Sequence, residues 1–123
     1  MTKLQKFGFF DNNANPKLVL SELRRDIPHI MEQNILHYLN GGHEFFLCMG
    51  IVEDFLDPQK TIIGPPNMWT DGTWVWTSDV MYYVEKYHIQ LPDDFLTHME
   101  LNNWQCPHVN TSDLELEDIV CFD

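Results

Sequence analysis

The chain has 123 residues, of which 44% are hydrophobic and 13% aromatic, so it is long and apolar enough to form one globular domain, 1–123, without a metal or disulfide. Its formal net charge of −12 disfavours nucleic acid and anionic membranes as partners and favours a cationic protein, unless the acidity serves only solubility. Three widely spaced cysteines, no basic and apolar leader, and no apolar run of about 18 residues predict a cytoplasmic protein with reduced thiols.

The N-terminal third gives one clear helix. Residues 18–23 fit a strand or a helical turn, and periodicity leaves both open. Residues 27–39 predict a helix with Asp26 as N-cap and Gly41 as its stop, because apolar side chains recur at helical spacing. These are Ile27, Ile30, Met31, Ile35, Tyr38 and Leu39.

The middle of the chain favours strands. Residues 44–52 are apolar on both faces and too short for a typical buried helix, which predicts a central strand. A turn at Asp57-Pro58 and a β-branched segment at 61–63 follow, and residues 64–67 break that segment.

Residues 69–99 are the best-ordered stretch. Asp71-Gly72 predicts a tight reversal, and residues 73–77 predict a strand with Trp74 and Trp76 on one face. Alternating tryptophans are typical of a core or sheet more often than of a binding surface.

Two helices should follow this strand. Thr77 or Ser78 is expected to cap the first by accepting from a helix amide, with Asp79 at the positive end of its dipole. The second should begin at Pro92. The expected apolar stripes are Val80, Met81, Val84, Tyr87 and His88 in the first helix, and Phe95, Leu96 and Met99 in the second.

This order of elements predicts an α+β domain, in which a small, mostly antiparallel sheet packs against three or so helices. Residues 112–117 fit either a half-buried strand or a capping box.

Catalytic and cofactor signals are weak. The six histidines show no metal-ligand spacing, and Gly41-Gly42 lacks the lysine or third glycine of a phosphate-binding loop, so we expect no metal and no cofactor. Cys106 and His108 place a thiol near an imidazole, but nucleophilic pairs are seldom neighbours in sequence. The prediction is a protein that is not an enzyme, with a small hydrolase as the weakest alternative.

One stretch carries a family resemblance. The segment DGTWVWTSDVMYYVEKYHIQLPDDFLTHM, about a quarter of the chain, resembles the signature of small bacterial immunity proteins found beside polymorphic toxins, including those of contact-dependent growth inhibition systems. The shared residues are Asp71, Gly72, Trp74, Trp76, Asp79, Tyr82, Tyr83, Val84, Tyr87, Leu91, Pro92, Phe95 and Met99. The resemblance implies a cytoplasmic toxin inhibitor that binds one cognate toxin domain, often a nuclease, and blocks its active site or substrate groove.

Charge supports the same kind of partner. Residues 1–25 have a balance of +3, so the rest of the chain carries −15, which suits a nuclease with a cationic surface. We expect the contacts in two acidic groups, one after the expected central strand and one near the C-terminus. The residues are Glu53, Asp54, Asp57, Asp113, Glu115, Glu117 and Asp118. The alternative is an interaction domain unrelated to toxins.

Overall fold

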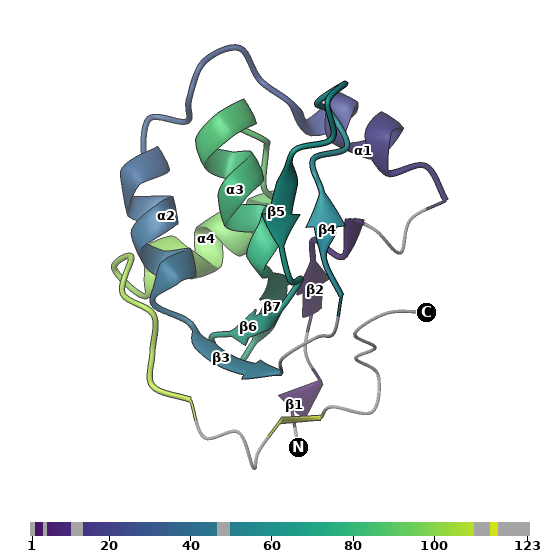
Figure 1. Ribbon diagram of the computed structural model, residues 1–123. Coiled ribbons are helices and arrows are strands. Elements are labelled where there is room, and N and C mark those ends of the chain that lie inside the picture. Colours follow the sequence, from purple (N-terminus) through teal and green to yellow (C-terminus); the bar gives the residue numbers. More distant parts are fainter. Residues whose placement is uncertain (1, 4, 11–13, 47–49, 110–113, 116–123) are drawn as a thin grey trace.

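The computed structural model describes residues 2–3, 5–10, 14–46, 50–109 and 114–115 (Figure 1). In these residues it has four helices, a mixed four-stranded sheet and two strand pairs. Most of the strand pairings in this α+β fold are antiparallel. The predicted fold class is therefore confirmed.

The main sheet is built around a hairpin. Its strand order is β2 (Gln5–Phe7), β7 (Trp74–Thr77), β6 (Met68–Thr70) and β3 (His43–Phe46). β2 runs parallel to β7, and the other two pairings are antiparallel. The two strand pairs are β4 (Val52–Glu53) with β5 (Ile62–Gly64), which is antiparallel, and β1 (Thr2–Lys3) with β8 (Leu114–Glu115), which is parallel.

The four helices are α1 (Pro16–Leu23), α2 (Glu32–Asn40), α3 (Ser78–Tyr87) and α4 (Asp93–Leu101). The structure resolves the open choice at 18–23 in favour of a helix. The Asn15 side chain accepts from the Leu18 amide at 3.2 Å, and Pro16 occupies the first helical position. Both features favour the start of a helix over a strand.

The predicted start of the helix at 27–39 is wrong, because α2 begins only at Glu32. Pro28 disfavours helical geometry at the residue before it. His29 then forms a turn, since its Nδ1 accepts from the Met31 amide at 2.9 Å. Ile27 and Ile30 are consequently outside the helix and are 67% and 94% exposed. The predicted stop at Gly41 is confirmed.

The predicted central strand at 44–52 is also wrong. Its first part, β3, is the edge strand of the main sheet, and its last part, β4, pairs with β5 instead. Gly50 has a φ of +90°, a backbone conformation that a strand does not use. Residues 47–49 lie outside the described residues.

The hairpin and the two helices after it follow the prediction, apart from the caps and from His88, which is expected in the stripe of the first helix but lies just beyond α3 in a left-handed conformation. Gly72 turns the chain with a φ of +96°, and β6 and β7 pair on either side of it. The expected capping bond is absent, because neither hydroxyl accepts from an amide of α3. Thr77 Oγ1 accepts from the Phe9 amide at 3.1 Å, and Ser78 Oγ accepts from the Trp69 indole at 3.3 Å. These hydroxyls join α3 to remote segments.

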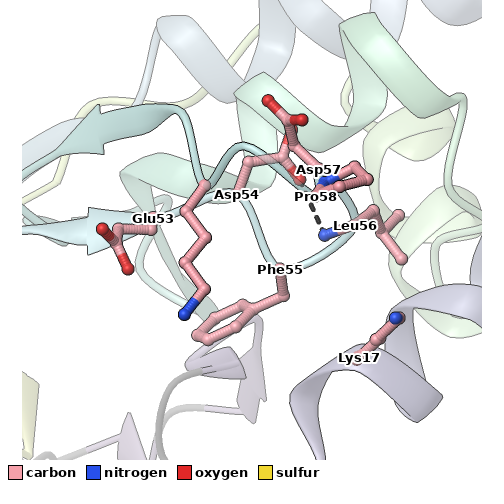
Figure 2. A pocket seen from close by; sticks show the side chains of 8 residues that line it. Lys17, Glu53, Asp54, Phe55, Leu56, Asp57 and Pro58 are labelled. Carbon is pink, nitrogen blue, oxygen red and sulfur yellow. Dashed lines mark hydrogen bonds between the residues drawn. The ribbon is translucent and has the colours of Figure 1, made fainter.

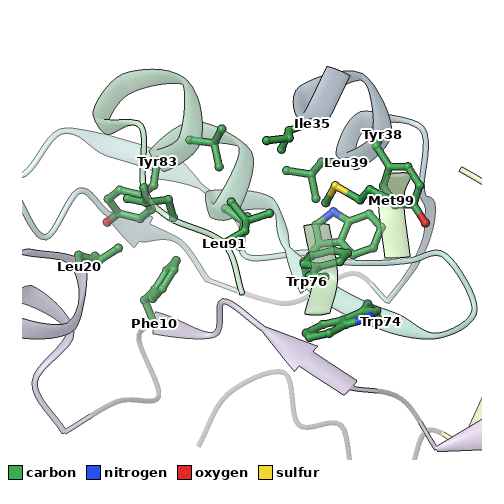
Figure 3. Close-up of a cluster of buried hydrophobic side chains, with 14 residues drawn as sticks. Phe10, Leu20, Ile35, Tyr38, Leu39, Trp74, Trp76, Tyr83, Leu91 and Met99 are labelled. Atoms are coloured by element: carbon green, nitrogen blue, oxygen red, sulfur yellow. The ribbon is translucent and has the colours of Figure 1, made fainter. Parts of the chain in front are cut away.

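The main core lies between the sheet and the helices (Figure 3). Trp74 stacks on Phe95 with ring centroids 4.5 Å apart, and Trp76 contacts the same ring at 5.6 Å. The prediction that Trp74 and Trp76 belong to the core is therefore confirmed. Tyr83, which lies outside the predicted stripe, is fully buried against Phe10.

Candidate partner-binding surface

The first group of predicted contact residues lies in and beside the β4–β5 loop, residues 54–61. The Asp54 amide donates to the Thr61 carbonyl at 2.8 Å, which closes the base of the loop. At its tip, the Asp57 carboxylate accepts from the Gln59 amide at 2.9 Å. This is the turn that the Asp57-Pro58 pair predicts, because aspartate bonds readily to the backbone two residues on.

Asp54 is fully buried and fastens the loop to α3. Its Oδ2 accepts from the Tyr82 and Tyr87 hydroxyls, both at 2.8 Å, and lies 3.4 Å from Lys86 Nζ. Burial raises the pKa of this carboxyl, but the hydrogen bonds from the two tyrosines, the Leu56 amide and Lys86 outweigh it and lower the pKa overall. Asp54 is thus occupied inside the protein, and the structure corrects its expected role as a partner contact.

Tyr83 holds the same loop through its backbone. Its hydroxyl accepts from the Phe55 amide at 3.0 Å and donates to the Glu53 carbonyl at 3.3 Å. Three tyrosines of α3 therefore fix three consecutive residues, the last residue of β4 and the first two of the loop. Sequence reasoning missed this role, although three tyrosines and a lysine within six residues of one helix were an available signal.

The other two acids of this group reach the surface. Glu53 is exposed and pairs across the strands with Ile62, which is 61% exposed. Asp57 is partly exposed, and hydrogen bonds from the Thr61 hydroxyl and the Gln59 amide lower its pKa. Glu53 and Asp57 are therefore available to a partner.

Lysines offset the charge of this region. A cleft of about 300 Å³ between the loop and α1 is lined by Glu53, Asp54 and Asp57 and also by Lys17 and Lys60 (Figure 2). Lys86 adds a third positive charge beside Asp54. Three acids thus face three lysines, so the loop does not form a net negative patch.

The second predicted group lies mostly beyond the described residues. Asp113, Glu117 and Asp118 fall outside them, and Glu115 belongs to β8, whose backbone pairs with Lys3 in β1. This pairing favours the strand reading for 114–115. The contact role of these four acids stays a prediction.

Basic side chains collect around Tyr87. The Arg24 guanidinium lies 5.0 Å from the centre of the Tyr87 ring and Lys86 Nζ 5.4 Å from it, while the Arg25 amide donates to the Tyr87 carbonyl at 3.2 Å. The exposed acids on the other described elements are Glu22 on α1, Glu44 on β3, Glu85 on α3 and Asp93, Asp94 and Glu100 on α4. α4 has three exposed carboxylates and no lysine or arginine, which makes it the most acidic of the described helices.

A second polar network is built on Asp71. Its carboxylate accepts from the Tyr38 hydroxyl at 2.5 Å and from the Trp74 amide at 2.7 Å, and it lies 3.2 Å from His98 Nε2. Burial and the contact with Asp71 both raise the pKa of Tyr38. The network ties the hairpin to α2 and α4, which is a structural task.

Cys106 lies beside this network and is not activated as a nucleophile. Burial, with a smaller effect of Asp71, raises the pKa of its thiol to about 12. Reactive cysteines have a lowered pKa, because the thiolate is the nucleophile. His108 is exposed. The hydrolase alternative therefore gains no support from this pair.

Cys106 should react with iodoacetamide at pH 8 at least about tenfold more slowly than an unhindered cysteine, because little of it is thiolate. Mass spectrometry of the peptide that contains Cys106, with the urea-unfolded chain as control, measures the rate. The reaction should accelerate on unfolding. Rapid alkylation of the folded chain at this residue would contradict the raised pKa.

Among the described residues, no three His, Cys, Asp or Glu side chains are grouped closely enough to hold a metal ion. In the same part of the chain, no helix combines the length and hydrophobicity needed to cross a bilayer. Searches with the whole chain matched no protein-family model, no curated protein and no solved structure.

Proposed function

We propose that this chain is a cytoplasmic immunity protein that binds a cognate toxin domain and neutralises it by covering its active site or substrate groove. The observation that carries the proposal is the negative charge exposed on α4, in a chain of net charge −12. Charge alone indicates a cationic protein as the partner. The resemblance of residues 71–99 to immunity proteins indicates that this partner is a toxin domain.

The charge suits a nuclease as the toxin. A nuclease presents cationic surface to phosphates, and an acidic inhibitor can occupy that surface in place of the nucleic acid. Electrostatic attraction also speeds encounter, to about 10⁸ M⁻¹s⁻¹ or more at low salt. Fast capture is useful to a cell that must inhibit a toxin as it arrives.

The test is to purify the chain with the toxin-domain product of the gene immediately upstream and to measure binding at two salt concentrations. The association rate should fall at least about tenfold between 50 mM and 500 mM salt, because salt screens attraction between exposed charges. The complex should also abolish the toxin's activity. Absence of a stable complex would refute the proposal, and a complex that leaves the toxin active would favour an interaction domain unrelated to neutralisation.

A further inference from the structure

A groove of about 280 Å³ lies between α4 and the segment before α2. α4 contributes Asp93, Leu96, Thr97 and Glu100 to it, residues whose spacing places them on one side of a helix. Met31 and Trp104 add apolar lining. The groove thus has an apolar middle and a carboxylate at either end of its α4 wall, about 10 Å apart at 1.5 Å per residue.

Two strongly exposed apolar residues are adjacent in the chain to residues that line this groove. Ile30 is 94% exposed, and its chain neighbours His29 and Met31 both line the groove. Leu101, next to the lining residue Glu100, is 78% exposed. Ile30 and Leu101 are the two most exposed of the large hydrophobic side chains among the described residues. Contiguous exposed apolar surface marks interaction sites more often than isolated apolar residues do.

The charge of the lining selects the occupant. Asp93 and Glu100 are acidic, and no lysine or arginine is among the described lining residues, in contrast to the cleft beside the β4–β5 loop. A second copy of this chain has a net charge of −12, so two copies would repel one another overall. A basic segment complements both the carboxylates and the apolar middle.

Resting on the proposed function, we infer that this groove is the docking site for a basic, amphipathic segment of the toxin domain. The segment places an apolar side chain against Met31, Leu96 and Trp104, and basic side chains toward Asp93 and Glu100. Aromatic residues and methionine are enriched in interface centres, with charged residues at the rim. The inference places the interface on α4, whereas the sequence predicted part of it at the β4–β5 loop.

The charge test compares two lysine substitutions at matched places. Glu100→Lys and Glu22→Lys make the same charge change at an exposed position one residue before the end of a helix, α4 and α1 respectively. With the upstream toxin domain as the probe, Glu100→Lys should slow association about tenfold at 50 mM salt. Glu22→Lys should change it less than about twofold.

The apolar test compares Ile30→Ser with Leu18→Ser, an exposed apolar residue on α1. Ile30→Ser should raise the Kd about tenfold, mainly through faster dissociation, whereas Leu18→Ser should leave it unchanged. Thermal unfolding of each of the four variants checks that the fold is kept. We expect it to be kept, because all four substituted side chains are exposed.

The outcomes separate the two proposals. Suppose that the unaltered chain binds the toxin domain, and that the groove variants bind it as well as the control variants do. The inference about the groove is then wrong, and the proposed function stands. If the unaltered chain binds no toxin domain, both fail. If sedimentation shows that the free chain is a dimer dispersed by Ile30→Ser, the occupant is a second copy and the inference is wrong.

Discussion

Replacing Gly8 with alanine is expected to lower the free energy of unfolding by about 3 kcal/mol. Gly8 has a φ of +104°, and a Cβ there would lie 2.6 Å from both Thr77 Oγ1 and Val80 Cγ2. Thr77 cannot rotate away cheaply, since its hydroxyl accepts from the Phe9 amide and donates to the buried Asp79 carboxylate. The methyl group would therefore disrupt the contact between the N-terminal segment and the start of α3.

Gly72→Ala is the matched control, because it separates backbone strain from crowding. Gly72 has a similar φ of +96°, but a Cβ there would meet Val109 Cγ2 at 3.8 Å, an ordinary contact. Gly72→Ala should lower the free energy of unfolding by only about 1 kcal/mol. Urea unfolding of both variants measures the difference, and equal losses would show that Gly8 is needed for its backbone conformation alone.

Asp54→Ala is expected to lower the free energy of unfolding by about 2–3 kcal/mol. The change removes the shared acceptor of the Tyr82 and Tyr87 hydroxyls and leaves Lys86 without its carboxylate. The β4–β5 loop should then detach from α3, which hydrogen exchange at the Phe55 and Leu56 amides would detect. Asp57→Ala, the same truncation at the partly exposed tip of the loop, should destabilise less.

The effect of Asp54→Ala should depend on pH in a defined direction. The pKa of Asp54 is lower in the folded protein than its ordinary value of 3.8, so ionised Asp54 stabilises the fold. That contribution is complete above the ordinary pKa and is lost as the pH falls through the lower folded value. The stability difference between the unaltered chain and Asp54→Ala should therefore be constant above about pH 5 and shrink below about pH 4. A difference that grows with acid would show that Asp54 is protonated in the folded state.

The polar residues of the segment 71–99 share a structural task. Asp71 binds Tyr38 of α2, while Tyr82 and Tyr87 bind Asp54 of the β4–β5 loop. In each case a residue of the segment fixes a part of the chain outside it. The segment is therefore a scaffold for the rest of the chain, apart from the part of α4 that lines the proposed docking groove.

The sequence by itself determined the elements that depend on neighbouring residues. The reversal at Gly72, the strand with Trp74 and Trp76, and the helix that follows Pro92 all result from local turn geometry, side-chain alternation and helical spacing. The fold class followed from their order. The net charge and the kind of partner it favours also came from sequence alone.

Only the tertiary structure decided how distant residues combine. Strand pairing placed β3 at a sheet edge and joined β4 to β5, because register is set by partners remote in sequence. Asp54 became an internal acceptor because α3 brings Tyr82 and Tyr87 to it. Lys17 of α1 offsets the charge of the loop only because the fold places it at the same cleft. The amino-acid sequence shows which side chains are charged. Packing between distant segments decides which of those charges face solvent and which neutralise one another.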